Sequence, residues 1–221
     1  MTLTLINARP SPFGRKVAIA LIEKSLDYTV EYDVPWADST ITPQHNPLEQ
    51  LPILIAEDGE TVYDSGYILT WLEAHYPEPR LIPAGAAAML EAKKRQLLGE
   101  RLMEAAQSLM LERKRPEPSA AWVDRQARKV TGALQALDAI YADRPVPRDD
   151  AAIDHGDIAV ATTLLLFEFA VADDLSEPID ALVWRGRYPA LTRFAEGIET
   201  RPSLVATAPA TMTVDLNETM N

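Results

Sequence analysis

A proline-rich segment at residues 77–85 divides the chain into two parts with different hydrophobic patterns. Before this segment, short alternating runs and amphipathic helical runs follow one another. After it, every patterned segment has helical spacing. Because Pro and Gly at this density interrupt both helices and strands, the segment is predicted to be a linker. We therefore predict two domains, an α/β domain over residues 1–79 and an all-α domain over residues 86–221.

The first part contains strand-like and helical runs in the order β-α-β-α-β-β-α. Alternating or β-branched residues predict four short strands, at residues 2–5, 28–32, 53–56 and 61–63. Ser11 followed by Pro12 is a typical helix start, and Ser65 opens a later helix. The stretch 36–45 is predicted to be a loop with some helix. This order of elements is the thioredoxin-like arrangement, in which helices cover the faces of a sheet.

The second part has only helical patterns, and they predict four helices, at residues 89–115, 120–141, 160–172 and 188–200. Asp154 is placed as a helix N-cap, with Asp157 at the third helical position in the manner of a capping box. Ile153 and Ile158 flank this cap and can pack together as a hydrophobic staple. These are folding signals, and we assign them no chemistry.

The balance of charge excludes several classes of partner. The 221 residues carry a net charge of −12, which argues against binding to nucleic acid or to anionic membranes. Residues 1–79 hold four Lys and Arg against twelve Asp and Glu, which gives −8, and the remainder gives −4. An anionic ligand of the first domain must therefore be held by local donors, because the overall field repels it.

The absence of cysteine removes disulfides, thiolate metal sites and any protein thiol as nucleophile. The three histidines are scattered without metal-ligand spacing, so we expect no metal. The N-terminal residues lack the features of a signal peptide, and we expect a cytoplasmic protein. The most apolar stretch, residues 158–172, is too short to span a bilayer and contains Glu168, so we predict a buried helix.

Three short motifs in the first domain together resemble the glutathione-binding residues of the cytosolic glutathione S-transferases, in a bacterial serine-type member. They are Ser11-Pro12-Phe13-Gly14-Arg15-Lys16-Val17, Leu51-Pro52 and Asp64-Ser65. The cap at Asp154, where the family usually has Ser or Thr, and the ending Arg201-Pro202-Ser203-Leu204 extend the resemblance over nearly the whole chain. The resemblance implies a thioredoxin-like domain followed by a helical domain, glutathione as co-substrate and a two-fold homodimer.

Ser11 has the position at which serine-type members place the hydroxyl that activates glutathione. The thiol of glutathione is mostly protonated at neutral pH, since a free thiol has a pKa of about 8.5. A hydrogen bond to a charged group contributes about 1.5–3 kcal/mol, so one hydroxyl at a helix N-terminus can lower the thiol pKa by about one to two units. The alternative is that Ser11 only caps its helix.

The other two motifs are assigned to the tripeptide by the resemblance. It implies a cis Pro52, with the N–H and C=O of Leu51 pairing with the cysteinyl unit as an added strand would. It also implies that Ser65 holds the γ-glutamyl carboxylate at a helix N-terminus, with help from Asp64. From the residues alone, Pro52 could be an ordinary turn proline, and Asp64-Ser65 a simple helix cap.

Two positions near these motifs depart from the family pattern. Gln50 can hydrogen-bond the peptide, but many relatives carry Lys there, which leaves the glycyl carboxylate without that cation. Gly14 stands where several serine-type classes have a second Ser or a Cys, so nothing at that position can substitute for Ser11. Phe13, next to Ser11 in the first motif, is included among the glutathione-binding residues.

The second substrate, a small hydrophobic electrophile, is expected between the two domains. The residues assigned to its pocket are Phe13, Trp36, Met103, Gln107 and Met110. The last three share one helix face through three- and four-residue spacing. An apolar stripe of this kind can equally be plain core.

Three functions are compatible with these residues. The first is a glutathione transferase that uses Ser11, and serine there in a chain without cysteine favours transfer over thiol–disulfide reduction. The second is a non-catalytic binding or assembly module of the same fold, since fold alone does not decide function. The third is a glutathione-dependent peroxidase, isomerase or dehalogenase that uses the same site.

Overall fold

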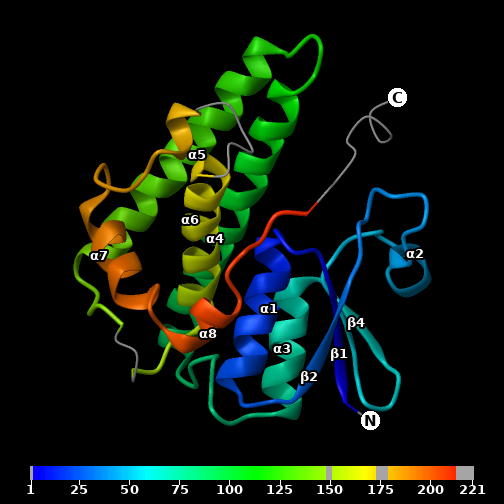
Figure 1. Ribbon diagram of the computed structural model, residues 1–221. Helices are drawn as coiled ribbons and strands as arrows, with labels where there is room; N and C mark the ends of the chain where they lie inside the picture. Colours follow the sequence, from blue (N-terminus) through cyan, green and yellow to red (C-terminus); the bar gives the residue numbers. More distant parts are fainter. Residues whose placement is uncertain (1, 148–150, 173–178, 213–221) are drawn as a thin grey trace. The chain divides into compact units, whose positions relative to one another are not determined.

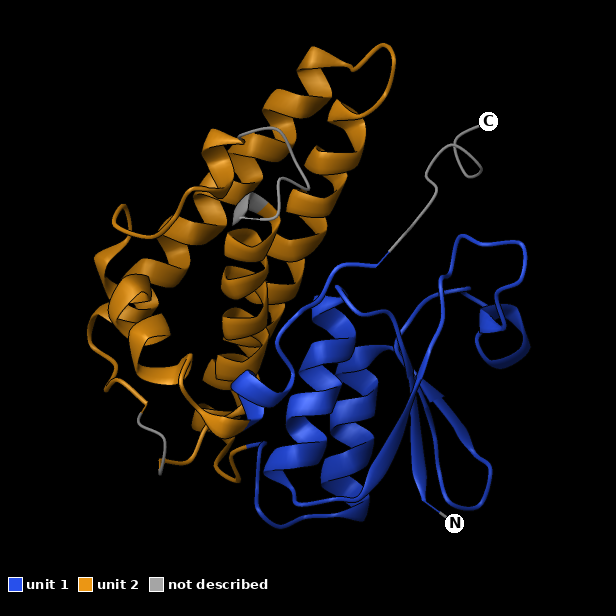
Figure 2. Cartoon of the chain, in the orientation of Figure 1, with its two compact units in different colours: residues 1–82, 203–221 blue, residues 83–202 orange. Residues whose placement is uncertain are grey.

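The computed structural model describes residues 2–147, 151–172 and 179–212 (Figure 1). The chain divides into two compact units, residues 1–82 with residues 203–221, and residues 83–202 (Figure 2). Within the described residues, no helix is long and apolar enough to cross a membrane.

Four strands form one mixed sheet in the first unit, in the order β2-β1-β3-β4. Their bounds are β1 (Leu3–Asn7), β2 (Tyr28–Tyr32), β3 (Ile53–Ile55) and β4 (Thr61–Tyr63). β1 is parallel to β2 and antiparallel to β3, and β3 is antiparallel to β4. All four predicted strands are present, although β1 begins one residue later and ends two residues later than predicted. The predicted thioredoxin-like order is confirmed.

Helices α1 (Pro12–Glu23) and α3 (Ser65–His75) pack side by side on one face of this sheet (Figure 1). α2 (Thr42–His45) is a single turn in the loop that follows β2. Most of the apolar side chains of α1 and of the central strands are fully buried, and these form the core of the unit. They include Leu5, Ile6, Val17, Ile19, Leu21, Ile53 and Leu54. Burial of such side chains is the main term that holds the helices on the sheet.

Lys24 ties the end of α1 to the segment after α3. Its ammonium group donates to the Glu73 carboxylate at 2.8 Å and to the carbonyls of Tyr76 and Pro79 at 2.8 and 2.9 Å. The Glu73 carboxylate also accepts the backbone N–H of Leu81. The Lys24 side chain is 1% exposed, so three acceptors replace the water that it loses.

The second unit consists of helices in its described residues. They are α4 (Ala86–Arg113), α5 (Ala120–Ala142), α6 (His155–Ala172) and α7 (Pro189–Ile198), with one 3₁₀ turn, η1 (Asp180–Leu182). α4 packs against both α5 and α6, and α5 also packs against α7. The all-helical prediction is confirmed for this unit, with helix ends that differ by a few residues from the predicted ones.

The division of the chain differs from the predicted one at both ends of the helical unit. The boundary falls after Ile82, and residues from Ser203 onward group with the first unit, including most of α8 (Pro202–Ala206). Two long-range hydrogen bonds link this segment to α1. The buried Arg15 guanidinium donates to the Leu204 carbonyl at 3.0 Å, and the Ser203 hydroxyl donates to the Glu23 carboxylate. Residues 213–221, the end of the predicted helical domain, lie outside the described residues.

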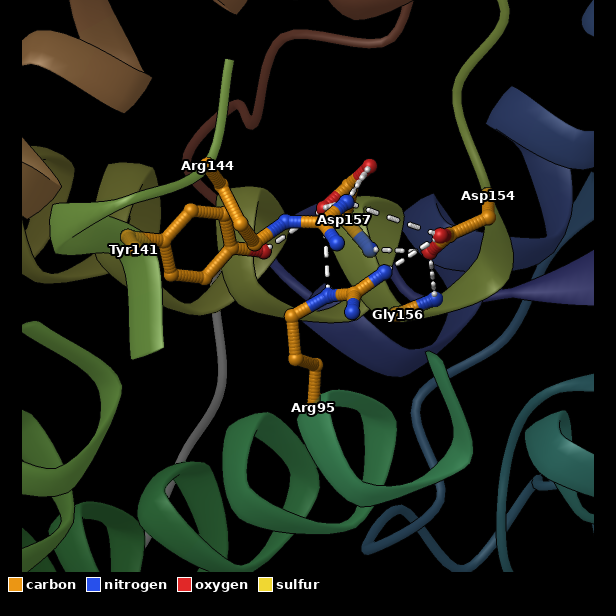
Figure 3. A network of polar contacts seen from close by, with 6 residues as sticks. All are labelled: Arg95, Tyr141, Arg144, Asp154, Gly156 and Asp157. Carbon is orange, nitrogen blue, oxygen red and sulfur yellow. Dashed lines mark hydrogen bonds and ion pairs between the residues drawn. The ribbon is translucent and has the colours of Figure 1, made fainter. Parts of the chain in front are cut away.

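The predicted cap of α6 is confirmed. The Asp154 carboxylate accepts the N–H groups of Gly156 and Asp157 at 2.9 and 3.0 Å (Figure 3). Ile153 and Ile158, the two residues of the expected staple, are both buried. In a reciprocal capping box, the Asp157 carboxylate would accept the backbone N–H of Asp154. Here it accepts the Tyr141 hydroxyl at 2.8 Å.

Two arginines complete this buried network. Arg95, which is 1% exposed, pairs with Asp154 and with Asp157, whose Oδ1 lies 3.3 Å from Nε (Figure 3). Arg144 reaches the Asp157 carboxylate at 3.4 Å. Burial and the neighbouring Asp154 charge raise the pKa of Asp157 further than Arg95 and Arg144 lower it. The network therefore joins α4, α5 and the start of α6.

Candidate active site at one edge of the sheet

The three predicted glutathione-binding motifs meet at one edge of the sheet. β1, β2 and β4 end at this edge, and β3 begins there, as the paired residues Asn7 with Tyr32, Ile6 with Ile53, and Ile53 with Tyr63 show. The segments that follow β1 and β4 and precede β3 carry the three motifs. The fold thus brings together residues that lie more than fifty positions apart in the sequence.

Ser11 is the N-cap of α1, as predicted. Its backbone has extended angles, and its hydroxyl accepts the N–H of Gly14 at 3.2 Å. Its own N–H donates to the Ala8 carbonyl at 3.0 Å, which closes the turn between β1 and α1. Among the described residues, none accepts a hydrogen bond from the Ser11 hydroxyl. The hydroxyl proton can therefore be directed at a ligand while the oxygen keeps its capping bond.

Gly14 is explained by its neighbour Asn7 at the end of β1. A β-carbon at residue 14 would overlap the side-chain amide of Asn7. That amide is buried, and its oxygen accepts the N–H of Ala8 at 2.8 Å. Asn7 is a site-shaping residue that sequence reasoning missed, because the bond it makes is visible only once β1 and α1 are placed together.

The Leu51-Pro52 peptide bond is cis, as the resemblance implied. Pro52 is buried and Leu51 is half-buried at the start of β3. Sequence reasoning also missed Asn46, whose buried side chain donates to the Gln50 carbonyl at 2.7 Å and accepts the N–H of Leu48 at 2.9 Å. Asn46 thus fixes the backbone just before Leu51, whereas the Gln50 side chain is exposed.

Asp64 and Ser65 form the start of α3. Asp64 is the N-cap, with a positive φ of 66°, and its carboxylate accepts the N–H groups of Gly66 and Tyr67 at 2.8 and 3.0 Å. Ser65 is buried at the first helical position. The capping interpretation is therefore confirmed for Asp64. The role of both residues toward a γ-glutamyl group stays a prediction.

The loop after β2 is organised by Asp33. Its carboxylate accepts the hydroxyls of Thr40 and Thr42 at 2.7 and 2.8 Å and the N–H groups of Val34 and Ile41. Partial burial raises the pKa of Asp33, but these hydrogen bonds outweigh it and lower the pKa below its ordinary value. Trp36, which was assigned to the electrophile pocket, is exposed on this loop.

The other pocket residues fall in both units. Phe13 is half-buried in the first turn of α1. Met103, Gln107 and Met110 lie on α4, where Met103 is buried and the other two are half-buried. Their helical spacing is confirmed, and a common electrophile pocket stays a prediction. In the described residues, no group of three or more His, Asp or Glu side chains is arranged to hold a metal ion.

Comparison with known proteins identifies the class to which this fold and site belong. Residues 5–80 match the family described as the N-terminal domain of glutathione S-transferase. A solved glutathione S-transferase from Methylobacterium radiotolerans, in complex with glutathione sulfonate, is 36% identical, with a TM-score of 0.86. The match covers 97% of this chain and 98% of that one. This chain belongs to the glutathione S-transferase family, and its two units have the architecture of that family.

Two further relatives are similar along almost their whole length. A glutathione S-transferase from Methylobacillus flagellatus with bound glutathione is 29% identical, with a TM-score of 0.84, and the match covers 95% of this chain and 100% of that chain. The uncharacterized GST-like protein YibF of Escherichia coli K12 is 26% identical over 209 residues, which are 94% of this chain and 98% of YibF.

Proposed function

We propose that this protein is a glutathione transferase that binds glutathione along the sheet edge described above and activates its thiol with Ser11. The observation that carries the proposal is the Ser11 hydroxyl, whose oxygen accepts the Gly14 N–H while its proton has no acceptor among the described residues. A hydroxyl in this state can donate to a thiolate. The N-terminus of α1 adds its partial positive charge.

The proposed mechanism divides glutathione among the three motifs. The Leu51 backbone pairs with the cysteinyl unit, while Ser65 and Asp64 hold the γ-glutamyl end at the N-terminus of α3. The hydrogen bond from Ser11 stabilises the thiolate by about 1.5–3 kcal/mol, which lowers the thiol pKa by about one to two units. The thiolate then attacks the electrophilic carbon of a small hydrophobic substrate and displaces the leaving group, so the protein supplies positioning and electrostatic stabilisation.

Support for glutathione as the ligand comes from the relatives. The Methylobacterium and Methylobacillus proteins were solved with glutathione sulfonate and with glutathione. The electrophile is proposed to contact Phe13, Trp36, Met103, Gln107 and Met110. We also propose a homodimer in the cytoplasm, and light scattering on the purified protein would test the dimer.

Two measurements test the proposal. Retention on immobilised glutathione separates a protein that uses glutathione from a scaffold that does not. Thiol consumption with an aryl halide then compares the wild type with Ser11→Ala. At pH 7 we expect a loss of about eight- to twenty-fivefold, which is the fall in thiolate population when the thiol pKa rises by about one to two units to about 8.5. Ser119→Ala is the matched control, because Ser119 caps α5 in the second unit in the same way and has no thiolate to activate.

The possible outcomes distinguish the remaining alternatives. Retention without any thiol consumption by the wild type would favour a binding module. Equal rates for the wild type and Ser11→Ala would remove Ser11 from the mechanism. Activity toward hydroperoxides in place of aryl halides would move the protein to the peroxidase alternative while keeping the site.

A further inference from the structure

Arg9 is an exposed cation at the proposed glutathione site. It lies in the turn between β1 and α1, two residues before Ser11, and its guanidinium carbon lies 4.2 Å from the centre of the Tyr32 ring at the end of β2. Within the described residues, Arg9 makes no ion pair. A guanidinium stacked on an aromatic ring is held in place but keeps its in-plane N–H donors for a carboxylate.

The other basic residues of the first unit are buried or lie away from this edge of the sheet. Residues 1–82 contain five Lys and Arg, and residues 203–221 contain none. Arg15, Lys16 and Lys24 are buried. Arg80 lies in the segment after α3, 3.9 Å from the Glu78 carboxylate. In a unit that is strongly acidic overall, Arg9 is thus the exposed cation beside Ser11.

The order of the strands indicates which part of glutathione would meet Arg9. Across the edge, the order β4, β3, β1, β2 places Ser65 first, then Leu51, then Ser11, and then Arg9 with Tyr32. In the proposed binding mode, the γ-glutamyl end lies at Ser65 and the sulfur at Ser11. The glycyl end therefore continues toward β2.

Approximate lengths agree with this order. Three strand spacings of about 4.8 Å give about 14 Å from β4 to β2. An extended tripeptide spans about 10–11 Å. The glycyl carboxylate would then end between β1 and β2, which is within the reach of an arginine side chain that begins in the turn after β1.

We propose that Arg9, positioned by Tyr32, binds the glycyl carboxylate of glutathione and so replaces the lysine that many relatives carry where this chain has Gln50. The inference rests on the proposed function, because it assumes that glutathione lies along this edge. A carboxylate that enters an acidic unit needs a local cation, and a planar guanidinium can bind it through two parallel hydrogen bonds. The exposed, neutral Gln50 side chain supplies no such charge.

A ligand pair isolates the contact. Glutathione has a charged glycyl carboxylate, whereas its glycyl ethyl ester is neutral there and carries an added ethyl group. Calorimetry would give the dissociation constant of each. For the wild type, we expect the ester to bind about tenfold more weakly, the order of effect for one hydrogen-bonded charge. For Arg9→Ala, we expect glutathione to bind about tenfold more weakly than to the wild type, and the two ligands to bind nearly equally.

Arg80→Ala is the matched control. It removes one exposed positive charge from the same unit, so it changes the overall field as Arg9→Ala does, and it should leave the penalty for the ester unchanged. Tyr32→Leu removes the ring but keeps Arg9, and it should reduce the difference in affinity between glutathione and the ester. Tyr32→Phe keeps a ring and should preserve that difference. Thermal unfolding of each variant checks that the exposed substitutions leave the fold intact.

The results separate the inference from the proposed function. A wild type that fails to bind glutathione would overturn both. A wild type that binds glutathione, with the same ester penalty in Arg9→Ala, would overturn the role of Arg9 and leave the proposed function in place. Loss of the penalty in Arg80→Ala as well would assign it to the overall field, and that result also overturns the inference.

Discussion

The side-chain amide of Asn7 occupies the space in which a β-carbon of residue 14 would lie. The same amide oxygen accepts the N–H of Ala8, so it cannot turn away without breaking that bond. The end of β1 and the first turn of α1 are therefore fitted to each other through one glycine. Since Ser11 lies between them, this contact sets the position of the proposed catalytic hydroxyl.

Gly14→Ala is predicted to destabilise the protein by about 1–3 kcal/mol, because the added methyl group overpacks a buried site. Asn7→Ala in the same chain should recover part of this loss by vacating the space. Denaturant unfolding of both single variants and the double variant measures the coupling between the two positions. Purely additive effects would contradict the contact.

Gly132→Ala provides the control for this series. Gly132 is exposed within α5, and a β-carbon there would meet nothing within 4 Å. The substitution should stabilise the protein by about 0.5–1 kcal/mol, since alanine loses less conformational freedom than glycine in a helix.

Ser11→Gly is predicted to separate the two roles of Ser11. Glycine is nearly as good an N-cap as serine, so stability should fall by only a few tenths of a kcal/mol, against about 1 kcal/mol for Ser11→Ala. Both variants lack the donor, so both should raise the pKa of bound glutathione by about one to two units. Ultraviolet titration of the thiolate measures this pKa. A variant with an unchanged thiol pKa would reduce Ser11 to a structural cap.

Lys24→Met is predicted to cost about 3–5 kcal/mol, because it leaves the buried Glu73 carboxylate without its cation. Adding Glu73→Gln should recover part of the loss, since the neutral amide costs less to bury. Unfolding in urea measures both changes. Arg101→Ala is the exposed counterpart, since it breaks the pair with Glu104 on the surface of α4, and it should cost less than about 1 kcal/mol.

Local pattern was sufficient to predict the elements of this fold and the cap residues within them. Ser11 and Asp154 were both placed as N-caps, because a cap is defined by neighbours three residues away. The alternation of short strands and the helical spacing after residue 85 likewise report only on local structure. Such patterns predict the observed structure well, because they do not depend on where the rest of the chain lies.

The contacts that could not be predicted join residues that are distant in sequence. Arg15 and Leu204 are 189 positions apart, and their hydrogen bond helps to group the residues after Ser203 with the first unit. The stack of Arg9 on Tyr32 and the network around Asp157 are of the same kind. Side-chain types alone do not indicate which of many possible partners the fold will bring close.

The buried Asp157 predicts a distinctive dependence of stability on pH. Its pKa is raised in the folded state, first by burial and then by the Asp154 charge, so the native protein binds this proton more tightly than the unfolded chain. The contribution of Asp157 to the free energy of unfolding is therefore fully present below its pKa in the unfolded chain. It is lost as the pH rises through its pKa in the folded protein. Asp157→Asn has no titrating group at this position, so its stability should not show this decrease as the pH rises.

The test compares the free energies of unfolding of the wild type and Asp157→Asn from about pH 4 to pH 7. The difference, wild type minus variant, should fall as the pH rises. Asp180→Asn is the control of opposite sign, because the hydrogen bond from Arg187 lowers the pKa of the exposed Asp180. The contribution of Asp180 should instead be lost as the pH falls. A difference for Asp157→Asn that rises with pH would mean that Arg95 and Arg144 outweigh burial in setting the charge of Asp157.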